Sequence, residues 1–170
     1  MITTRRYTVK PVDENELDSV LEVYRSSEEF LALGPQPRAS LEMIRSDMEL
    51  SKTECGTYCG IWDSECRMIG IVDFVADCFD GVRGHGFLSL LMISASRRGL
   101  GIGTEIVTAI EQEIAREYGV TTILSAVQTN NYPAIRFWRK MGYRIVSGPE
   151  PQQDGTVTYR LSKSLPNREA

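Results

Sequence analysis

Histidine and paired cysteines, the usual side chains of metal sites, are scarce in this sequence. It contains one histidine, His85, and four cysteines, Cys55, Cys59, Cys66 and Cys78. The cysteines lack the C-x-x-C spacing of a typical zinc site, and in an extended strand Cys55 and Cys59 would lie about 13 Å apart, too far for a disulfide. We therefore expect no metal site and reduced, buried thiols in a cytoplasmic protein.

The sequence also lacks an excess of positive charge and any long hydrophobic segment. Its formal net charge is −4 at pH 7 and its isoelectric point is near 5.1, unlike a general nucleic-acid-binding protein. The first residues contain no apolar signal-peptide core, and no stretch approaches the length of about 18 apolar residues that spans a membrane. We expect a protein that is neither secreted nor inserted in a membrane, and that binds no nucleic acid.

What the sequence does contain is enough apolar material for one hydrophobic core. It has 170 residues, of which 42% are hydrophobic and 25% charged, as in ordinary globular proteins. With no linker, repeat or low-complexity tract, we expect a single domain over residues 1–165.

Hydrophobic periodicity and turn residues predict an ordered series of strands and helices. Strands are expected at 5–11, 56–63, 67–78, 87–93, 121–127, 143–148 and 155–163. Helices are expected at 13–32, 40–50, 102–118 and 130–141. Because three consecutive strands precede the third helix, the order excludes the regular alternation of a doubly wound parallel sheet. It predicts an α/β (α+β) fold with a mixed, largely antiparallel central sheet of about six to seven strands, flanked by about four helices.

Residues 95–107, ASRRGLGIGTEIV, place a glycine-rich turn between an apolar strand and a helix. The N–H groups at a helix N-terminus have no acceptor within the helix, and glycines allow a phosphate to approach them closely. Arg97 and Arg98 add charge suited to a pyrophosphate, and Thr104 adds a hydroxyl group. The turn lacks the lysine of a P-loop, and its alternating glycines do not match the G-x-G-x-x-G of a dinucleotide fold. It predicts a phosphate site of another type, with an ordinary tight turn as the alternative.

Two segments resemble the signatures of the GNAT superfamily, the acetyl-CoA-dependent N-acetyltransferases. Residues 98–103, RGLGIG, match its [QR]-x-x-G-x-[GA] motif. Residues 130–146, NNYPAIRFWRKMGYRIV, resemble its second signature, N-x-x-A-x-x-[FL]-[YF]-x-x-x-G-[FY], through Asn131, Ala134, Phe137, Gly142 and Tyr143. The expected order of elements also resembles the GNAT fold over nearly the whole chain.

The resemblance implies where a coenzyme would bind. In that fold the strands corresponding to 87–93 and 121–127 splay apart, and the pantetheine arm lies between them, against backbone groups near Leu91, Met92 and Ile93. A free strand edge offers unpaired N–H and C=O groups for such pairing. The pyrophosphate would lie on the glycine turn, formed by Arg98, Gly99, Leu100, Gly101, Ile102, Gly103 and Thr104. Asn131 would face the coenzyme, with the role of a helix N-cap as its alternative or addition.

The resemblance leaves the acid of the reaction open. The family commonly has a tyrosine after the Phe137 position to protonate the leaving thiolate, but Trp138 stands there, and its indole N–H is no usable acid. We expect Trp138 to pack or hydrogen-bond beside the coenzyme sulfur, since a thiol with a pKa near 8.5 leaves as a thiolate without an acid. Tyr132 and Tyr143 are possible substitutes, although packing is the expected role of each. A backbone N–H near Ile93 would stabilise the oxyanion.

The general base departs from the family pattern too, because Phe87 and Ser89 replace its usual glutamate or histidine. Asp73 is one candidate, since partial burial raises the pKa of a carboxyl group; its alternative is an aspartate at a strand edge or end that faces water. His85 is the other candidate if the strand extends to it, and its alternative is a solvated loop histidine. A chain of water molecules leading to bulk solvent is a third route.

The sequence thus predicts an N-acetyltransferase that moves the acetyl group from acetyl-CoA to a primary amine by direct transfer. The acceptor would be a small molecule or a peptide, and the protein a monomer or homodimer. The alternative is a catalytically inactive acyl-CoA-binding sensor or interaction protein, which the absence of the usual acid and base leaves open.

Overall fold

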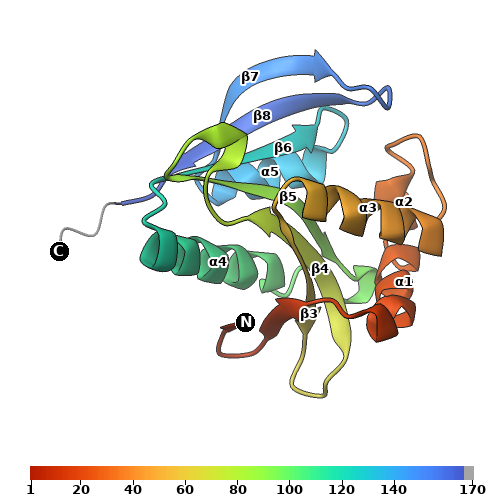
Figure 1. Ribbon diagram of the computed structural model, residues 1–170. Helices are drawn as coiled ribbons and strands as arrows, with labels where there is room; N and C mark the ends of the chain where they lie inside the picture. Colours follow the sequence, from red (N-terminus) through yellow and green to blue (C-terminus); the bar gives the residue numbers. More distant parts are fainter. Residues whose placement is uncertain (167–170) are drawn as a thin grey trace.

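The computed structural model describes residues 1–166, which form one open sheet with helices on both faces (Figure 1). The strands are β1 (Ile2–Thr3), β2 (Thr8–Pro11), β3 (Thr57–Trp62), β4 (Met68–Val75), β5 (His85–Ile93), β6 (Thr122–Gln128), β7 (Arg144–Pro151) and β8 (Val157–Ser164). The α-helices are α1 (Leu17–Arg25), α2 (Glu28–Leu31), α3 (Leu41–Thr53), α4 (Ile102–Tyr118) and α5 (Tyr132–Lys140). Short 3-10 helices are η1 (Glu14–Glu16), η2 (Phe79–Gly81) and η3 (Ala95–Arg97).

The sheet is continuous in the order β1-β2-β3-β4-β5-β6-β8-β7, and within the described residues β5 and β6 are its one parallel pair. This pairing is short, with residues 85–88 opposite 122–125. Beyond Leu88, β5 continues beside β4 to Ile93, while β6 continues beside β8 to Gln128. The sheet therefore opens between β5 and β6, which confirms the splayed strands implied by the GNAT resemblance.

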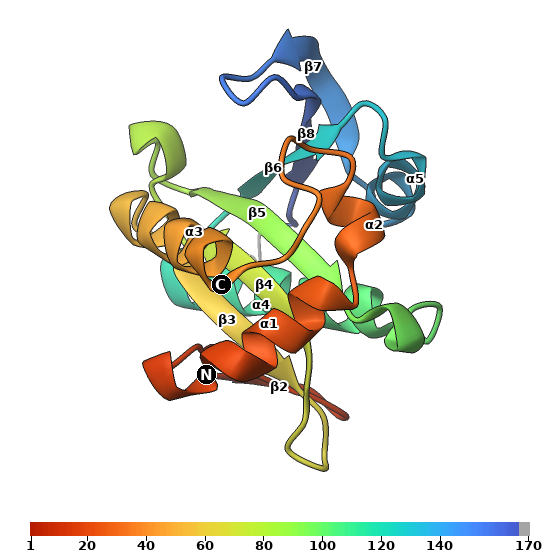
Figure 2. The same cartoon turned by 90° about the vertical axis from the view of Figure 1, so that its right-hand side faces the viewer.

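Two hydrophobic cores hold the helices on opposite faces of the sheet. Helices α4 and α5 cover one face, where Ile106 and Ile110 of α4 pack with Leu88 of β5. Helices α1 and α3 lie over the other face, where Val20 and Ile44 pack with sheet residues (Figure 2). These side chains are almost completely buried, and each such burial stabilises the fold by about 1.5–3 kcal/mol. The cores fix the two strands that border the opening.

The structure confirms the α/β class and the mixed, largely antiparallel sheet, with more elements than expected. The helix expected over 13–32 is divided, because α1 ends at Arg25 and α2 begins at Glu28. Between them the Ser26 hydroxyl donates to the Val23 carbonyl oxygen at 2.8 Å, a local hydrogen bond that competes with helix continuation. The additional strand, β1, has two residues and is too short for periodicity to predict.

The prediction of buried cysteines is correct for one residue and wrong for three. Cys59 is buried in β3, and burial raises the pKa of its thiol to about 12. The other three, Cys55, Cys66 and Cys78, are exposed and have φ values of 58°, 57° and 60°. They stand in tight turns rather than in strands, which explains their exposure. All four thiols are free.

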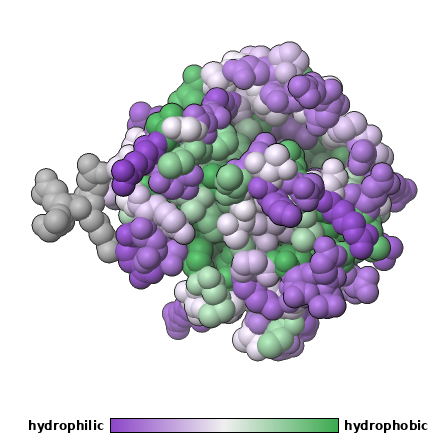
Figure 3. Space-filling model, in the orientation of Figure 1, coloured by the Kyte–Doolittle hydropathy of each residue, from purple (hydrophilic) through white to green (hydrophobic). Residues whose placement is uncertain are grey.

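On the face of the molecule drawn in Figure 1, hydrophilic residues predominate around the edge, and hydrophobic areas lie between them (Figure 3). Within residues 1–166, none of the helices has both the length and the apolar character needed to cross a membrane.

Candidate active site

The glycine turn leaves the backbone open at the start of α4. Gly99 and Gly101 have φ values of +76° and +78°, in the left-handed region that favours glycine. Gly101 is the N-cap and contributes no side chain, and its carbonyl oxygen accepts from the Glu105 N–H at 3.1 Å. A Cβ at Gly99 would meet nothing within 4 Å, and at Gly101 only the Arg6 guanidinium, at 3.9 Å. The amides of the first turn of α4 are therefore accessible to an anion.

Gly103 has a different role from its two neighbours. It lies inside α4, and a Cβ there would come within 3.2 Å of the Phe137 ring and 3.6 Å of Leu91. Glycine at 103 thus allows α4 to pack closely against α5 and β5. The expectation that its missing side chain leaves room for a phosphate is wrong, although its amide still lies in the first turn.

The two arginines of the turn point away from it toward other partners. Arg98 donates to the Ile93 carbonyl oxygen at 2.9 Å, to the Ser27 hydroxyl at 3.0 Å and to the Glu29 carboxylate. Arg97 pairs with Asp63 at 3.3 Å. Both guanidinium groups hold neighbouring segments to the turn, so the structure does not place their charges at the amides of α4 as the sequence predicted.

The other half of the candidate coenzyme site is the free edge of β5. Leu91, Met92 and Ile93 pair with β4 on one side and lie beyond the end of the β5–β6 pairing on the other. Leu91 and Ile93 pack toward the hydrophobic core under α4 and α5. Met92 packs toward the core on the opposite face, under α1 and α3. Within residues 1–166 the backbone groups on the open side of this segment pair with no strand, although the Ile93 carbonyl oxygen accepts from Arg98. An extended ligand therefore has an edge to bind that leads directly to the glycine turn.

Asp73 is buried in β4, next to the point where the sheet opens, and only 8% of its surface is exposed. The Ser51 hydroxyl donates to its Oδ1 at 2.6 Å, and the Ser89 hydroxyl donates to its Oδ2 at 2.7 Å. The burial expected for Asp73 is confirmed, and the alternative of a water-facing aspartate is wrong. No ion pair among residues 1–166 includes this carboxylate.

Ser89 owes its position to a β-bulge. Asp73 lies opposite Leu90 and Phe74 lies opposite Leu88, so Ser89 is the extra residue of β5. It is exposed, and it is the first residue beyond the β5–β6 pairing. The sequence interpretation dismissed Ser89 because serine alone is no base. The bulge that joins it to Asp73 depends on strand register, which no local pattern predicts.

His85 is the first residue of β5, so the strand does extend to it, as its role as a candidate base requires. It is partly buried and lies opposite Thr122 of β6. Asp73 is opposite Leu90, five residues further along the same strand, which corresponds to about 16 Å. The structure therefore does not bring the two candidate bases together. Asp73 is the one that adjoins the opening.

The chain is similar to known acetyltransferases in sequence and in fold. A family model described as Acetyltransferase (GNAT) family matches residues 17–143. The chain belongs to the GNAT acetyltransferase family. GNAT acetyltransferases use acetyl-CoA as their co-substrate.

Two curated relatives match parts of this GNAT chain. It is 30% identical over 78 residues to a blasticidin-S acetyltransferase from Streptomyces morookaense, covering 46% of this chain and 56% of the relative. It is 32% identical over 85 residues to an uncharacterized N-acetyltransferase from Methanocaldococcus jannaschii, covering 49% and 54%. The chain thus spans about half the length of the curated relatives it matches.

Solved structures match this GNAT fold over almost the whole chain. An acetyltransferase from Thermus thermophilus has a TM-score of 0.76 and 20% identity, covering 97% of this chain and 100% of the other. A spermidine N-acetyltransferase from Vibrio cholerae, in complex with CoA and spermine, has a TM-score of 0.71 and 10% identity, covering 95% and 96%. At these identities the similarity shows the fold.

Asn131 and Trp138, the two predicted coenzyme contacts on α5, each have a structural role in this GNAT structure. The Asn131 side chain accepts from the Ala134 N–H at 3.2 Å, which makes it the N-cap of α5, as its alternative stated. Trp138 is 6% exposed and packs edge-on against Phe137 and Tyr143 within the α4–α5 core. The prediction that its ring lies beside a coenzyme sulfur is therefore not supported, and packing describes its role.

The two tyrosines considered as substitute acids lie in different surroundings. Tyr143 is buried and donates to Glu111 at 2.9 Å; Glu111 also accepts from Lys163 at 2.6 Å. Burial and the adjacent Glu111 carboxylate raise the pKa of Tyr143 far above its ordinary value. Tyr132 is 67% exposed at the start of α5. Packing is confirmed as the role of Tyr143, whereas the exposed Tyr132 does not have the packing role expected for it.

A second polar cluster under α3 was missed by sequence reasoning. The Tyr24 hydroxyl lies 2.7 Å from Asp47 Oδ2 and 2.7 Å from the Tyr58 hydroxyl. Burial raises the pKa of Asp47, and the nearby charge of Asp73 raises it further. These residues come from α1, α3 and β3, so their contact follows only from the tertiary fold.

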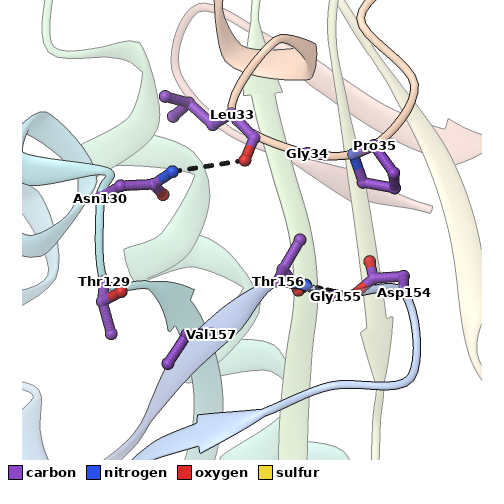
Figure 4. Close-up of a pocket in the computed structure, with 9 residues that line it drawn as sticks. All are labelled: Leu33, Gly34, Pro35, Thr129, Asn130, Asp154, Gly155, Thr156 and Val157. Atoms are coloured by element: carbon purple, nitrogen blue, oxygen red, sulfur yellow. Dashed lines mark hydrogen bonds between the residues drawn. The ribbon is translucent and has the colours of Figure 1, made fainter.

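A pocket of about 360 Å³ lies between three loops at one end of the sheet (Figure 4). It is lined by Leu33, Gly34, Pro35, Thr129, Asn130, Asp154, Gly155, Thr156 and Val157. The Asn130 amide donates to the Leu33 carbonyl oxygen at 3.3 Å, which joins two of the loops. Hydrogen bonds from the Thr156 hydroxyl and N–H lower the pKa of Asp154, so a carboxylate lines this pocket.

Proposed function

We propose that this GNAT chain is an N-acetyltransferase that moves the acetyl group from acetyl-CoA to a primary amine by direct transfer. The observation that carries the proposal is the open sheet edge of β5 leading into the exposed amides of the glycine turn. An extended pantetheine arm suits a free strand edge, and a pyrophosphate suits a helix N-terminus. One ligand, coenzyme A, contains both groups in that order.

The residues of the chain fit such a coenzyme. Backbone groups near Leu91, Met92 and Ile93 would hold the pantetheine arm. The amides from Arg98 to Thr104 would hold the pyrophosphate, with room in front of Gly99 and Gly101. Leu100 is 56% exposed at the tip of the turn, so its side chain leaves the backbone accessible.

We assign proton removal from the amine to Asp73, acting through Ser89. Ser89 is an exposed residue at the opening, and its hydroxyl lies 2.7 Å from Asp73 Oδ2 and 3.0 Å from the Asp73 carbonyl oxygen. As the amine attacks, its proton would pass to Ser89 Oγ while the Ser89 proton passes to the carboxylate. Ser51 holds the other oxygen and so fixes the orientation of the carboxylate. His85 lies too far along β5 to share this step.

The leaving thiolate needs no acid in this scheme. A thiolate whose conjugate thiol has a pKa near 8.5 is a tolerable leaving group near neutral pH. This accounts for Trp138 in the core at the position where the family commonly has tyrosine.

The acceptor would be a small molecule or a peptide bearing a primary amine. The pocket lined by Asp154 supports this class, because a carboxylate there favours a cationic group. The blasticidin-S and spermidine acetyltransferases named above are consistent with a polar, amine-bearing acceptor. We further propose that residues 1–165 act as one domain, since a single sheet runs from β1 to β8.

The proposal is tested by measuring free-thiol release from acetyl-CoA with a panel of primary amines. We expect release that depends on an amine and is reduced in Asp73→Asn. Acetyl-CoA binding without release for any amine would favour the inactive acyl-CoA-binding alternative. Absence of binding would contradict both.

A further inference from the structure

The turn between β1 and β2 brings Arg6 to the glycine turn, although almost a hundred residues separate them in the sequence. Arg6 Nη2 lies 3.5 Å from the Leu100 carbonyl oxygen. The same nitrogen is 3.9 Å from the position that a Cβ at Gly101 would take, and apart from the adjoining backbone and neighbouring residues nothing else in residues 1–166 lies within 4 Å of that position. The guanidinium group of Arg6 therefore borders the open space in front of the Gly101 backbone.

Glu105 fixes this orientation. It lies in the first turn of α4, where its carboxylate accepts from Arg6 Nε at 2.8 Å and lies 2.7 Å from Nη2. The Arg6 backbone N–H also donates to Glu105, at 3.3 Å. These contacts engage Nε and Nη2, and within residues 1–166 no acceptor is bound to Nη1. One side of the guanidinium group remains available for a ligand.

Arg6 also supplies a free guanidinium donor beside the Gly101 backbone, which the turn's own arginines do not. Arg97 is paired with Asp63, and every nitrogen of the Arg98 guanidinium group is hydrogen-bonded elsewhere. An unpaired Glu105 would oppose a phosphate at the first turn of α4, and Arg6 neutralises it. The resulting site combines backbone amides with the free Nη1 donor of a guanidinium group whose charge is balanced by Glu105, an arrangement that suits a pyrophosphate.

We propose that Arg6 is a coenzyme-binding residue that donates to the pyrophosphate of acetyl-CoA from outside the GNAT glycine motif. The inference rests on the proposed function, because it assumes that the coenzyme binds at the glycine turn. It adds a residue from the N-terminal β1–β2 turn to a site otherwise built from β5 and α4.

Calorimetric titration of four proteins with CoA and with dephospho-CoA, which lacks only the 3′-phosphate, tests this role. The proteins are the wild type, Arg6→Ala, Glu105→Gln and Arg5→Ala. Arg5 is the exposed neighbour of Arg6 and controls for loss of one positive charge. We expect Arg6→Ala to raise Kd for both ligands by about tenfold, as for the loss of one charge-assisted hydrogen bond. Arg5→Ala should change Kd by less than about twofold, since the charge it removes is exposed and screened. Glu105→Gln should raise Kd less than Arg6→Ala does, because glutamine keeps an acceptor for Arg6 and removes a negative charge beside the phosphates.

Thermal melts without ligand accompany the titrations. They test the alternative that Arg6 and Glu105 serve only to attach the β1–β2 hairpin to α4. In that case Arg6→Ala and Glu105→Gln would weaken binding equally and lower Tm equally, which would overturn the proposal. An unchanged Kd in folded Arg6→Ala would overturn it as well. Weakened binding of CoA but not of dephospho-CoA would contradict the assignment to the pyrophosphate. If the wild type binds neither ligand, the proposed function itself fails, a result distinct from all of these.

Discussion

Replacing Gly101 with valine separates a phosphate-binding turn from a merely structural one. Gly101 has φ +78°, and a side chain in this left-handed region costs roughly 1–2 kcal/mol of stability. For a chain of this length we expect Tm to fall by about 2–8 °C, while the protein stays folded. The space in front of Gly101 is open, so valine would meet only Arg6 and would cause no clash in the core.

Coenzyme binding should weaken as well, through an effect separate from the backbone strain. The valine side chain would occupy the space through which a phosphate reaches the amides of α4. Losing one hydrogen bond between an amide and a charged phosphate costs about 1.5–3 kcal/mol, which corresponds to a rise in Kd of roughly 10- to 100-fold. Calorimetry with acetyl-CoA measures this change, and a thermal melt without ligand measures the stability cost.

Gly119→Val is the matched control. Gly119 ends the same helix with φ +67° and has equally open surroundings, so its substitution carries the same backbone strain far from the glycine turn. It should lower Tm similarly and leave Kd unchanged. Wild-type affinity in a folded Gly101→Val protein would refute the assignment of this turn to the pyrophosphate.

Four further outcomes follow from the structure. Asp73→Asn should lower kcat by about 10²- to 10⁴-fold in steady-state kinetics, with coenzyme affinity unchanged; a wild-type kcat would exclude Asp73 as the base. Acetyl-CoA should raise Tm much more than pantetheine, which lacks the pyrophosphate, and equal shifts would count against a phosphate site. A thiol reagent should modify Cys55, Cys66 and Cys78 in the native protein and Cys59 only after denaturation. Because burial raises the pKa of Cys59 from near 9 to about 12, the folded state disfavours the thiolate, so the free energy of unfolding should fall as pH rises between these values. Urea titrations should show a shallower decline in Cys59→Ala than in the wild type, because buried tyrosines such as Tyr143 contribute a decline of their own to both proteins; identical declines would contradict the role of Cys59.

Local sequence patterns predicted the parts of the site that a few neighbouring residues determine. The glycine turn and the start of α4 depend on Gly99 and Gly101, whose conformational freedom is a property of the residues themselves. The N-cap role of Asn131 is equally local, since its partner is three residues away. The family resemblance predicted the opening of the sheet between β5 and β6. One of the two motifs follows each of these strands in the sequence.

Contacts between distant segments could not be predicted in this way. Arg98 was expected to face a phosphate, but its partners Ser27 and Glu29 come from the segment around α2, about 70 residues earlier. The pairing of Ser89 with Asp73 requires a one-residue bulge between β4 and β5, and a single step of register reverses the direction of a side chain. Packing likewise decided the position of Trp138, whose sequence context fitted both the core and the site.

The central claim is that the chain transfers acetyl groups from acetyl-CoA to amines. The most direct test supplies acetyl-CoA with a ¹³C-labelled acetyl group together with a panel of primary amines, and identifies the products by mass spectrometry. We predict a labelled N-acetyl amine in amounts that exceed the enzyme and that fall in the Gly101→Val and Asp73→Asn proteins. Unlabelled amines beside intact, bound acetyl-CoA would contradict the claim.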